Sequence, residues 1–175
     1  MIPDKIFVVG FIGSRTREIA QVLAERVDRP HFDTDQVVEA SARMSLAELF
    51  RNEGESGYRQ RERRAVVSVS TGPPAIISTG HRSFVDRGNR RTMQQFGVAV
   101  FVDATLEECL KDALDHGLLR IDDPNNERFS TLYEAQRFEY EAADVIVEPM
   151  GRDPETVADE IMQRLEDRVW SEKLT

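Results

Sequence analysis

Short apolar runs and longer segments of helical spacing alternate along this chain. The first apolar run, Ile6–Val9, is rich in β-branched residues and is closed by Gly10, a pattern typical of a buried strand. The next segment, Thr16–Val27, carries apolar residues three to four positions apart and stops before a proline, which predicts a helix. The chain therefore begins with a strand, a glycine-containing turn and a helix.

The same alternation continues to the C-terminus. Further buried strands are expected at His31–Asp33, Ala75–Ser78, Val98–Val102 and Val145–Val147. Helices are expected over Tyr58–Ser70, Glu134–Ala143 and Glu155–Val169 and after two capping boxes, Ser45 with Glu48 (a helix ending by Gly54) and Thr105 with Glu108. Strands that alternate with helices predict an α/β fold, a three-layer α/β/α sandwich around a five-stranded parallel sheet, in a single domain over residues 1–175.

Composition and charge narrow the function classes. The 175 residues carry a formal net charge of −9, which argues against a nucleic-acid binder because phosphate backbones require a basic face. No apolar run approaches the roughly 20 residues of a membrane-spanning helix, and the N-terminus lacks a secretory pattern, so a cytoplasmic protein is expected. The single cysteine, Cys109, excludes an intramolecular disulfide and is expected to be a buried, inert thiol.

Three segments follow predicted strands directly: Gly10–Arg17, Asp33–Asp35 and Gly80–Arg82. In parallel α/β sheets, ligands bind at the carboxyl ends of the strands, so these segments are expected to face one crevice. The first segment reads G-F-I-G-S-R-T-R and occupies the place of a phosphate-binding P-loop, whose pattern is G-x-x-x-x-G-K-[ST].

This candidate phosphate loop departs from the pattern at its functional end. Its residues are Gly10, Gly13, Ser14, Arg15, Thr16 and Arg17. The last three stand where a P-loop has a glycine, a lysine that reaches the terminal phosphates, and a hydroxyl that holds Mg²⁺. The helix start still offers N–H donors to an anion, with nearby arginines adding positive charge. Alternatively, Arg15 and Arg17 are merely solvated residues at a helix start.

Several segments together resemble the shikimate kinases, small P-loop kinases of the nucleoside-monophosphate-kinase-like fold that phosphorylate a hydroxyl of a cyclic carboxylic acid. Arg29–Asp35, R-P-H-F-D-T-D, is similar to the family's R-P-F-F-D-T-D, and Gly54–Glu62 resembles its G-E-x-x-F-R-x-x-E. Ser78–Gly80 resembles the start of its A-T-G-G-G, and Val102–Ala104 its strand end L-D-A. The stretch from position 10 to position 62 aligns with the family without a gap.

The resemblance implies roles for five residues. Asp33 would be the catalytic carboxylate near the metal and the acceptor hydroxyl, and Asp35 would accept hydrogen bonds from the substrate's hydroxyls. Arg59 would pair with the substrate carboxylate, a task suited to its planar guanidinium. Gly80 would bring the backbone close to the substrate, and Arg137, at altered spacing, would be a second carboxylate-binding arginine.

The family also implies ATP and Mg²⁺ as cofactors and a lid at about residues 112–130. Asp112 stands where a helix arginine is expected, His116-Gly117-Leu118-Leu119 replaces the lid's R-P-L-L, and Gly80-His81-Arg82 replaces a run of three glycines. Lost electrostatic groups of this kind typically contribute ~3 kcal/mol each to phosphoryl transfer. The sequence therefore favours a kinase homologue with a degenerate ATP site, weakly active or inactive, that binds a small anionic, shikimate-like metabolite.

Two other functions stay open. One is an active kinase of shikimate or a related hydroxy acid with a rebuilt phosphate loop, and the other is a structural or interaction module. At the residue level, Asp35 could instead cap a helix over Gln36–Ala40, and Arg59 could form a surface ion pair with Glu55 or Glu62. Neither His81 nor His116 has metal-ligand spacing, so no metal site is expected.

Overall fold

Five parallel strands form the sheet of the computed structural model, which describes residues 2–117 and 127–173. The strands are β1 (Lys5–Gly10), β2 (His31–Asp33), β3 (Ala75–Ser78), β4 (Val98–Val102) and β5 (Val145–Val147). Their order across the sheet is β2-β3-β1-β4-β5, and every neighbouring pair is parallel. The predicted five-stranded parallel sheet is confirmed.

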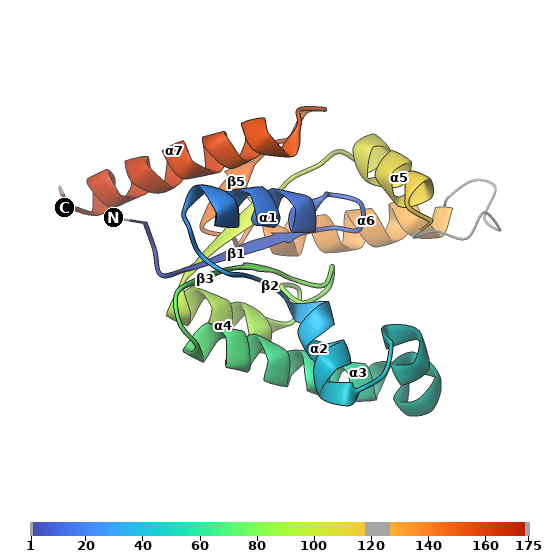
Figure 1. The fold of residues 1–175 in the computed structure, drawn as a ribbon. Helices are drawn as coiled ribbons and strands as arrows, with labels where there is room; N and C mark the ends of the chain where they lie inside the picture. Colours follow the sequence, from blue (N-terminus) through green and yellow to red (C-terminus); the bar gives the residue numbers. More distant parts are fainter. Residues whose placement is uncertain (1, 118–126, 174–175) are drawn as a thin grey trace.

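Helices cover both faces of this sheet (Figure 1). They are α1 (Thr16–Arg26), α2 (Thr34–Ala42), α3 (Leu46–Thr71), α4 (Arg87–Phe96), α5 (Leu106–Asp115), α6 (Glu127–Tyr140) and α7 (Pro154–Lys173). On one face, Ile6 and Val8 of β1 pack with apolar residues of α1 and α7. On the other face, Phe7 and Val9 pack with residues of α3, α4 and α6. Because β1 is covered from both sides, its continuous apolar run is buried, and the predicted three-layer sandwich is confirmed.

Three helices differ from the sequence-based expectation. The pattern did not predict α4, because Asn89 and Met93 are its only buried residues. Helix α6 begins at Glu127 and not at Glu134. Helix α3 continues beyond Gly54, the expected end, but Gly54 itself has φ 68° and ψ −172°, so two helical segments meet there at a kink.

The carboxyl ends of the strands carry the phosphate loop, the start of α2 and the turn after β3. Next to the phosphate loop, a small apolar cluster joins Phe11 and Cys109 to Phe129 and Tyr133 of α6. Of the expected lid at about 112–130, the end of α5 and the start of α6 are described, whereas residues 118–126, including Leu118 and Leu119, lie outside the described residues. Among the helices of the described ranges, none has both the length and the apolar character that crossing a membrane demands.

Candidate functional site

The phosphate loop places a residue other than glycine in the left-handed backbone conformation. Arg15, at the position of the last P-loop glycine, has φ 59° and ψ 27°, the left-handed conformation that non-glycine residues rarely adopt. The backbone N–H and the hydroxyl of Ser14 both donate to the Phe11 carbonyl, at 3.1 and 2.6 Å, and close the turn. Gly13, with φ 80°, has no room for a side chain, because a Cβ there would overlap the Cys109 carbonyl. The loop is therefore closely packed and fixed.

The Arg15 side chain binds carboxylates of the protein itself. Its guanidinium donates to Glu18 Oε2 through Nη2 at 2.5 Å and Nε at 3.0 Å, and Nε lies 3.8 Å from Asp112 Oδ1. The hydrogen bond to Glu18 raises the pKa of Arg15 above its usual value. This positive charge is thus directed toward α1 and α5.

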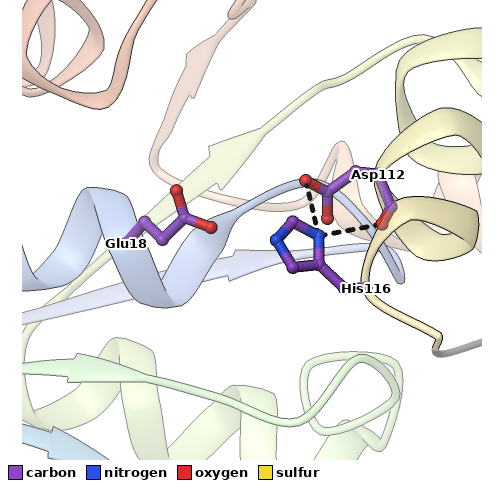
Figure 2. A group of neighbouring side chains, drawn as sticks. All are labelled: Glu18, Asp112 and His116. Atoms are coloured by element: carbon purple, nitrogen blue, oxygen red, sulfur yellow. Dashed lines mark hydrogen bonds and ion pairs between the residues drawn. The ribbon is translucent and has the colours of Figure 1, made fainter.

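His116 joins the same carboxylates from the end of α5. Figure 2 shows its ring between Glu18 and Asp112, and its Nδ1 lies 2.9 Å from the Asp112 backbone oxygen and 3.3 Å from Asp112 Oδ1. These contacts, the backbone hydrogen bond foremost, raise the pKa of His116. One ligand-type atom from each of the three residues lies within 4.8 Å of the others, the arrangement of a divalent-cation site. Because Arg15 already pairs with both carboxylates, the group in this structure is an ion-pair network that joins the phosphate loop to α5.

Asp33 caps helix α2. Its Oδ1 accepts hydrogen bonds from the backbone N–H groups of Asp35 and Gln36, at 3.1 and 3.2 Å, and its Oδ2 accepts one from the Ser78 hydroxyl at 2.7 Å. The alternative that Asp35 caps this helix is therefore wrong, because the helix begins at Thr34 and the cap lies one residue earlier. The side chain of Asp35 therefore does not cap the helix and contacts other residues.

Asp35 is partly buried and forms a hydrogen-bonded group with the buried residues Tyr58 and Glu62. The Tyr58 hydroxyl lies 2.6 Å from Asp35 Oδ1 and 3.1 Å from Glu62 Oε1, and Glu62 is completely buried. Burial raises the pKa of the Asp35 carboxyl to about 6, against the lowering effect of the Tyr58 hydrogen bond. Burial, followed by the two carboxylates, also raises the pKa of Tyr58, so its hydroxyl keeps its proton.

Two arginines lie beside this group. Arg59 Nη1 donates to Glu62 Oε2 at 2.8 Å, and Arg59 Nε lies 3.6 Å from Glu55. Arg82 binds the same Glu55 at 2.7 Å. Both ion pairs anticipated for Arg59 exist, but Glu62 is buried and not on the surface. His81 lies near both guanidinium groups, and burial together with these charges lowers its pKa to about 4, so its ring is neutral at physiological pH.

One cleft of about 670 Å³ joins the phosphate loop to the segments after β2 and β3. Its walls include Gly10–Glu18, Asp33, Asp35, Thr79, Gly80, His81 and His116. The three segments that follow strands in the sequence therefore do meet. Arg137 lies apart from these walls, because its guanidinium makes a two-pronged contact with Asp103, at 3.1 and 2.6 Å, and pairs with Glu141 at 3.2 Å. Its role in substrate binding stays a prediction.

A model of the shikimate kinase family matches residues 13–166. The chain belongs to the shikimate kinase family. It is 35% identical to a shikimate kinase of Symbiobacterium thermophilum over 169 residues, which cover 93% of this chain and 97% of that protein.

Solved structures share this fold. A shikimate kinase from Acinetobacter baumannii in complex with shikimate is similar at a TM-score of 0.86 and 23% identity, covering 100% of this chain and 97% of the other. The shikimate kinase from Aquifex aeolicus is similar at a TM-score of 0.82 and 26% identity, covering 95% and 98%.

In the group formed by Asp35, Tyr58 and Glu62, sequence reasoning gave Tyr58 no role and gave Glu62 only that of an ion-pair partner of Arg59. Tyr58 stands at the phenylalanine of the shikimate kinase motif G-E-x-x-F-R-x-x-E, a substitution that adds one hydroxyl to an aromatic ring. Glu62 matches the last position of that motif. The exchange of phenylalanine for tyrosine was the available signal, since a tyrosine hydroxyl normally finds a partner when it is buried.

Proposed function

We propose that this chain is a shikimate kinase homologue with a degenerate nucleotide site, which binds a small anionic hydroxy acid and transfers phosphate weakly or not at all. The observation that carries the proposal is the position of Arg15. Arg15 stands where a P-loop has its last glycine, and its guanidinium pairs with Glu18 and Asp112. Thr16 stands where a P-loop has its lysine.

The residues present do not fit Mg·ATP as a P-loop does. Thr16 has no charge to offer the phosphates, and Arg17 has no hydroxyl for Mg²⁺. Both oxygens of Asp33 already accept hydrogen bonds within the protein. Each lost electrostatic group typically lowers the rate of the chemical step by ~10²–10³-fold, so a kinase without them is expected to be very slow.

The acceptor half retains the groups that an anionic hydroxy acid requires. Asp35 and Gly80 line the cleft, where the carboxylate offers a hydrogen-bond acceptor for a ligand hydroxyl. Arg59 and Arg82 lie close to this region, where both pair with Glu55 and Arg59 also pairs with Glu62, so a ligand carboxylate would compete with these glutamates for the guanidinium groups. His81 adds a neutral donor to the wall. The family member from A. baumannii is described in complex with shikimate, which makes this acid the first ligand to test.

Isothermal titration calorimetry with shikimate and, separately, with Mg·ATP tests both halves. We expect shikimate to bind and Mg·ATP to give no heat at micromolar concentration, with no turnover in a coupled assay. Micromolar Mg·ATP binding with turnover would contradict the degenerate nucleotide site. Absence of shikimate binding would contradict the acceptor half.

A replacement in the phosphate loop tests whether its residues are the reason that Mg·ATP does not bind. The triple variant Arg15→Gly, Thr16→Lys, Arg17→Ser rebuilds the P-loop pattern, and Arg15→Gly alone is the control that frees Glu18 and Asp112 without adding a lysine. We expect Mg·ATP binding only in the triple variant. If the triple variant still fails to bind, Asp112 and His116 contribute as much to the loss as the loop does.

A second candidate, an active kinase with a rebuilt loop, is favoured by one observation. Arg15 keeps the left-handed backbone conformation of the loop, so the N–H groups at the start of α1 remain available to an anion. In such a kinase, Arg17 at the first turn of α1 would contact the phosphates, and Arg17→Ala would abolish turnover.

A further inference from the structure

The hydroxyl of Tyr58 lies between two carboxyl groups but carries only one proton. Its oxygen is 2.6 Å from Asp35 Oδ1 and 3.1 Å from Glu62 Oε1, both within hydrogen-bonding range. A phenol donates a single hydrogen bond, so when Tyr58 donates to one carboxylate, the other contact is a hydrogen bond only if that carboxyl is protonated. The shorter distance identifies Asp35 Oδ1 as the preferred acceptor.

The remaining contacts of Glu62 support this assignment. Its second oxygen, Oε2, accepts a hydrogen bond from Arg59 at 2.8 Å, so the charge of Glu62 is already compensated. The Arg59 guanidinium also lies over the Tyr58 ring, 4.9 Å from its centre, and holds the ring in place. Asp35 has no arginine partner of this kind, and Tyr58 is the side chain that donates to it in the described part of the chain.

Gly80 covers the same oxygen of Asp35 from the side of β3. A Cβ at Gly80 would lie 2.9 Å from Asp35 Oδ1, 2.9 Å from the Tyr58 hydroxyl and 3.2 Å from Glu62 Oε1. The backbone therefore closes over Oδ1, and a ligand in the cleft meets the Asp35 carboxylate through Oδ2. Within the described residues, no side chain or backbone group donates to Oδ2.

We propose that Tyr58 is a specificity-determining residue, whose hydroxyl occupies one Asp35 oxygen and prevents a pair of neighbouring ligand hydroxyls from binding both oxygens of the Asp35 carboxylate at once. This inference rests on the proposed function, because it concerns the ligand of the acceptor half. The family motif has phenylalanine here, which leaves both carboxylate oxygens to the substrate's hydroxyls. His81 and Arg82, in place of two glycines, add side chains near the same site. The substrate class is therefore a hydroxy carboxylic acid that contacts Asp35 through Oδ2 alone, without a pair of hydroxyls bridging both carboxylate oxygens.

Ligand discrimination tests the substrate class. The affinities of the wild type, Tyr58→Phe and the control Tyr133→Phe are measured by calorimetry for shikimate and its three monodeoxy analogues. Tyr133 is a suitable control, because its hydroxyl donates to the Ala104 carbonyl at 2.9 Å, outside the cleft. We expect the wild type and Tyr133→Phe to bind shikimate and its best monodeoxy analogue within about threefold, whereas Tyr58→Phe prefers shikimate by about tenfold or more, the typical effect of one hydrogen bond to a charged group.

A titration without ligand tests the contact itself. The Asp35 carboxyl carbon is followed by ¹³C NMR in the wild type, Tyr58→Phe and Tyr133→Phe. Loss of the Tyr58 donor should raise the Asp35 pKa in Tyr58→Phe only, because the carboxylate form loses a hydrogen bond.

The two measurements separate the inference from the proposed function. A wild type that already prefers shikimate tenfold, or an unchanged preference in Tyr58→Phe, overturns the inference. An Asp35 pKa that is the same in Tyr58→Phe also overturns it. If none of the proteins binds any of the acids, the proposed acceptor site and its selectivity both fail, while a raised Asp35 pKa would still establish the Tyr58–Asp35 bond.

Discussion

At the scale of single residues, Arg15 combines an unfavourable backbone with favourable side-chain contacts. A left-handed conformation costs an L-residue of ordinary type about 1–2 kcal/mol. The ion pair with Glu18 is two-fifths exposed on each side and contributes at most about 1 kcal/mol. The strain is therefore about as large as the ion pair that accompanies it.

Comparison of Arg15→Gly with Arg15→Ala isolates the backbone contribution. Both variants lose the ion pairs, but only glycine relieves the left-handed conformation. We expect Arg15→Gly to be more stable than Arg15→Ala by about 1 kcal/mol in urea unfolding, the reverse of the usual order of these two residues. Equal stability of the two variants would mean that the turn is not held in this conformation in solution.

Asp35 destabilises the fold above the pH at which it ionises. Its pKa is raised from 3.8 to about 6, so the folded state binds this proton more tightly than the unfolded state does. The cost of Asp35 is absent below the unfolded pKa and reaches its full size as the pH rises through the folded value. For a shift of about two units, that cost is about 3 kcal/mol.

Asp35→Asn removes this titration and keeps an oxygen that accepts from Tyr58. The free energy of unfolding of Asp35→Asn relative to the wild type is expected to increase by about 2–3 kcal/mol between pH 4 and pH 8. Urea unfolding at these two pH values checks it. A difference that does not change with pH would show that the Asp35 pKa is the same in the folded and unfolded states.

At the scale of secondary-structure elements, the kink of α3 positions the acceptor residues. Gly54 separates the first turns of the helix from the segment that carries Tyr58, Arg59 and Glu62. Its φ and ψ lie in a region that is almost exclusive to glycine. A Cβ at Gly54 would meet nothing within 4 Å, so the requirement for glycine is purely conformational.

Gly54→Ala is therefore expected to destabilise the protein by about 1–3 kcal/mol. Gly72→Ala is the matched control, because Gly72 has φ −74° and its nearest atom to an added Cβ is 3.5 Å away. The control should be neutral or stabilise by up to about 1 kcal/mol. Thermal unfolding of both variants, followed by circular dichroism, measures the contrast. A neutral Gly54→Ala would refute the kink.

Sequence patterns predicted strands and helices well where one face, or the whole element, is buried. The strands other than β2 appear as apolar runs because both faces of the sheet are covered. Both predicted capping boxes are present, at Ser45 and Thr105. The charged helix α4 escaped prediction because it buries little apolar surface. In the site, strand ends were sufficient to bring Asp33, Asp35 and Gly80 together. The contact of Arg15, Glu18 and Asp112 could not be predicted, since it depends on how α5 packs beside the loop.

At the scale of the whole molecule, the acceptor site of an acidic protein holds two arginines, each of which is paired with a glutamate. The net charge of −9 is unfavourable for distant anions, whereas Arg59 and Arg82 act only at close range. Binding of an anionic acid is therefore a local property of the cleft. It should add directly to the stability of the folded state.

Thermal denaturation with ligands measures this coupling. Shikimate at one hundred times its dissociation constant should stabilise the fold by about 2.7 kcal/mol and raise the melting temperature by a few degrees. Mg·ATP at the same concentration should leave the melting temperature unchanged. Sodium benzoate, an acid without hydroxyl groups, is the control for non-specific anion effects. A shift with Mg·ATP and none with shikimate would reverse the assignment of the two halves.

Because Cys109 packs against Gly13, its thiol can serve as a chemical probe of motion near the phosphate loop. Cys109 is the only cysteine of the chain and is completely buried, and burial raises the pKa of its thiol to about 12. Its carbonyl lies directly under the Gly13 backbone. The thiol itself is packed among Phe11 of the loop and Phe129 and Tyr133 of α6, so a reagent reaches this sulfur only when α5 separates from these neighbours. The rate of covalent labelling measures how often these elements separate. Any ligand that holds the loop closed should slow the labelling.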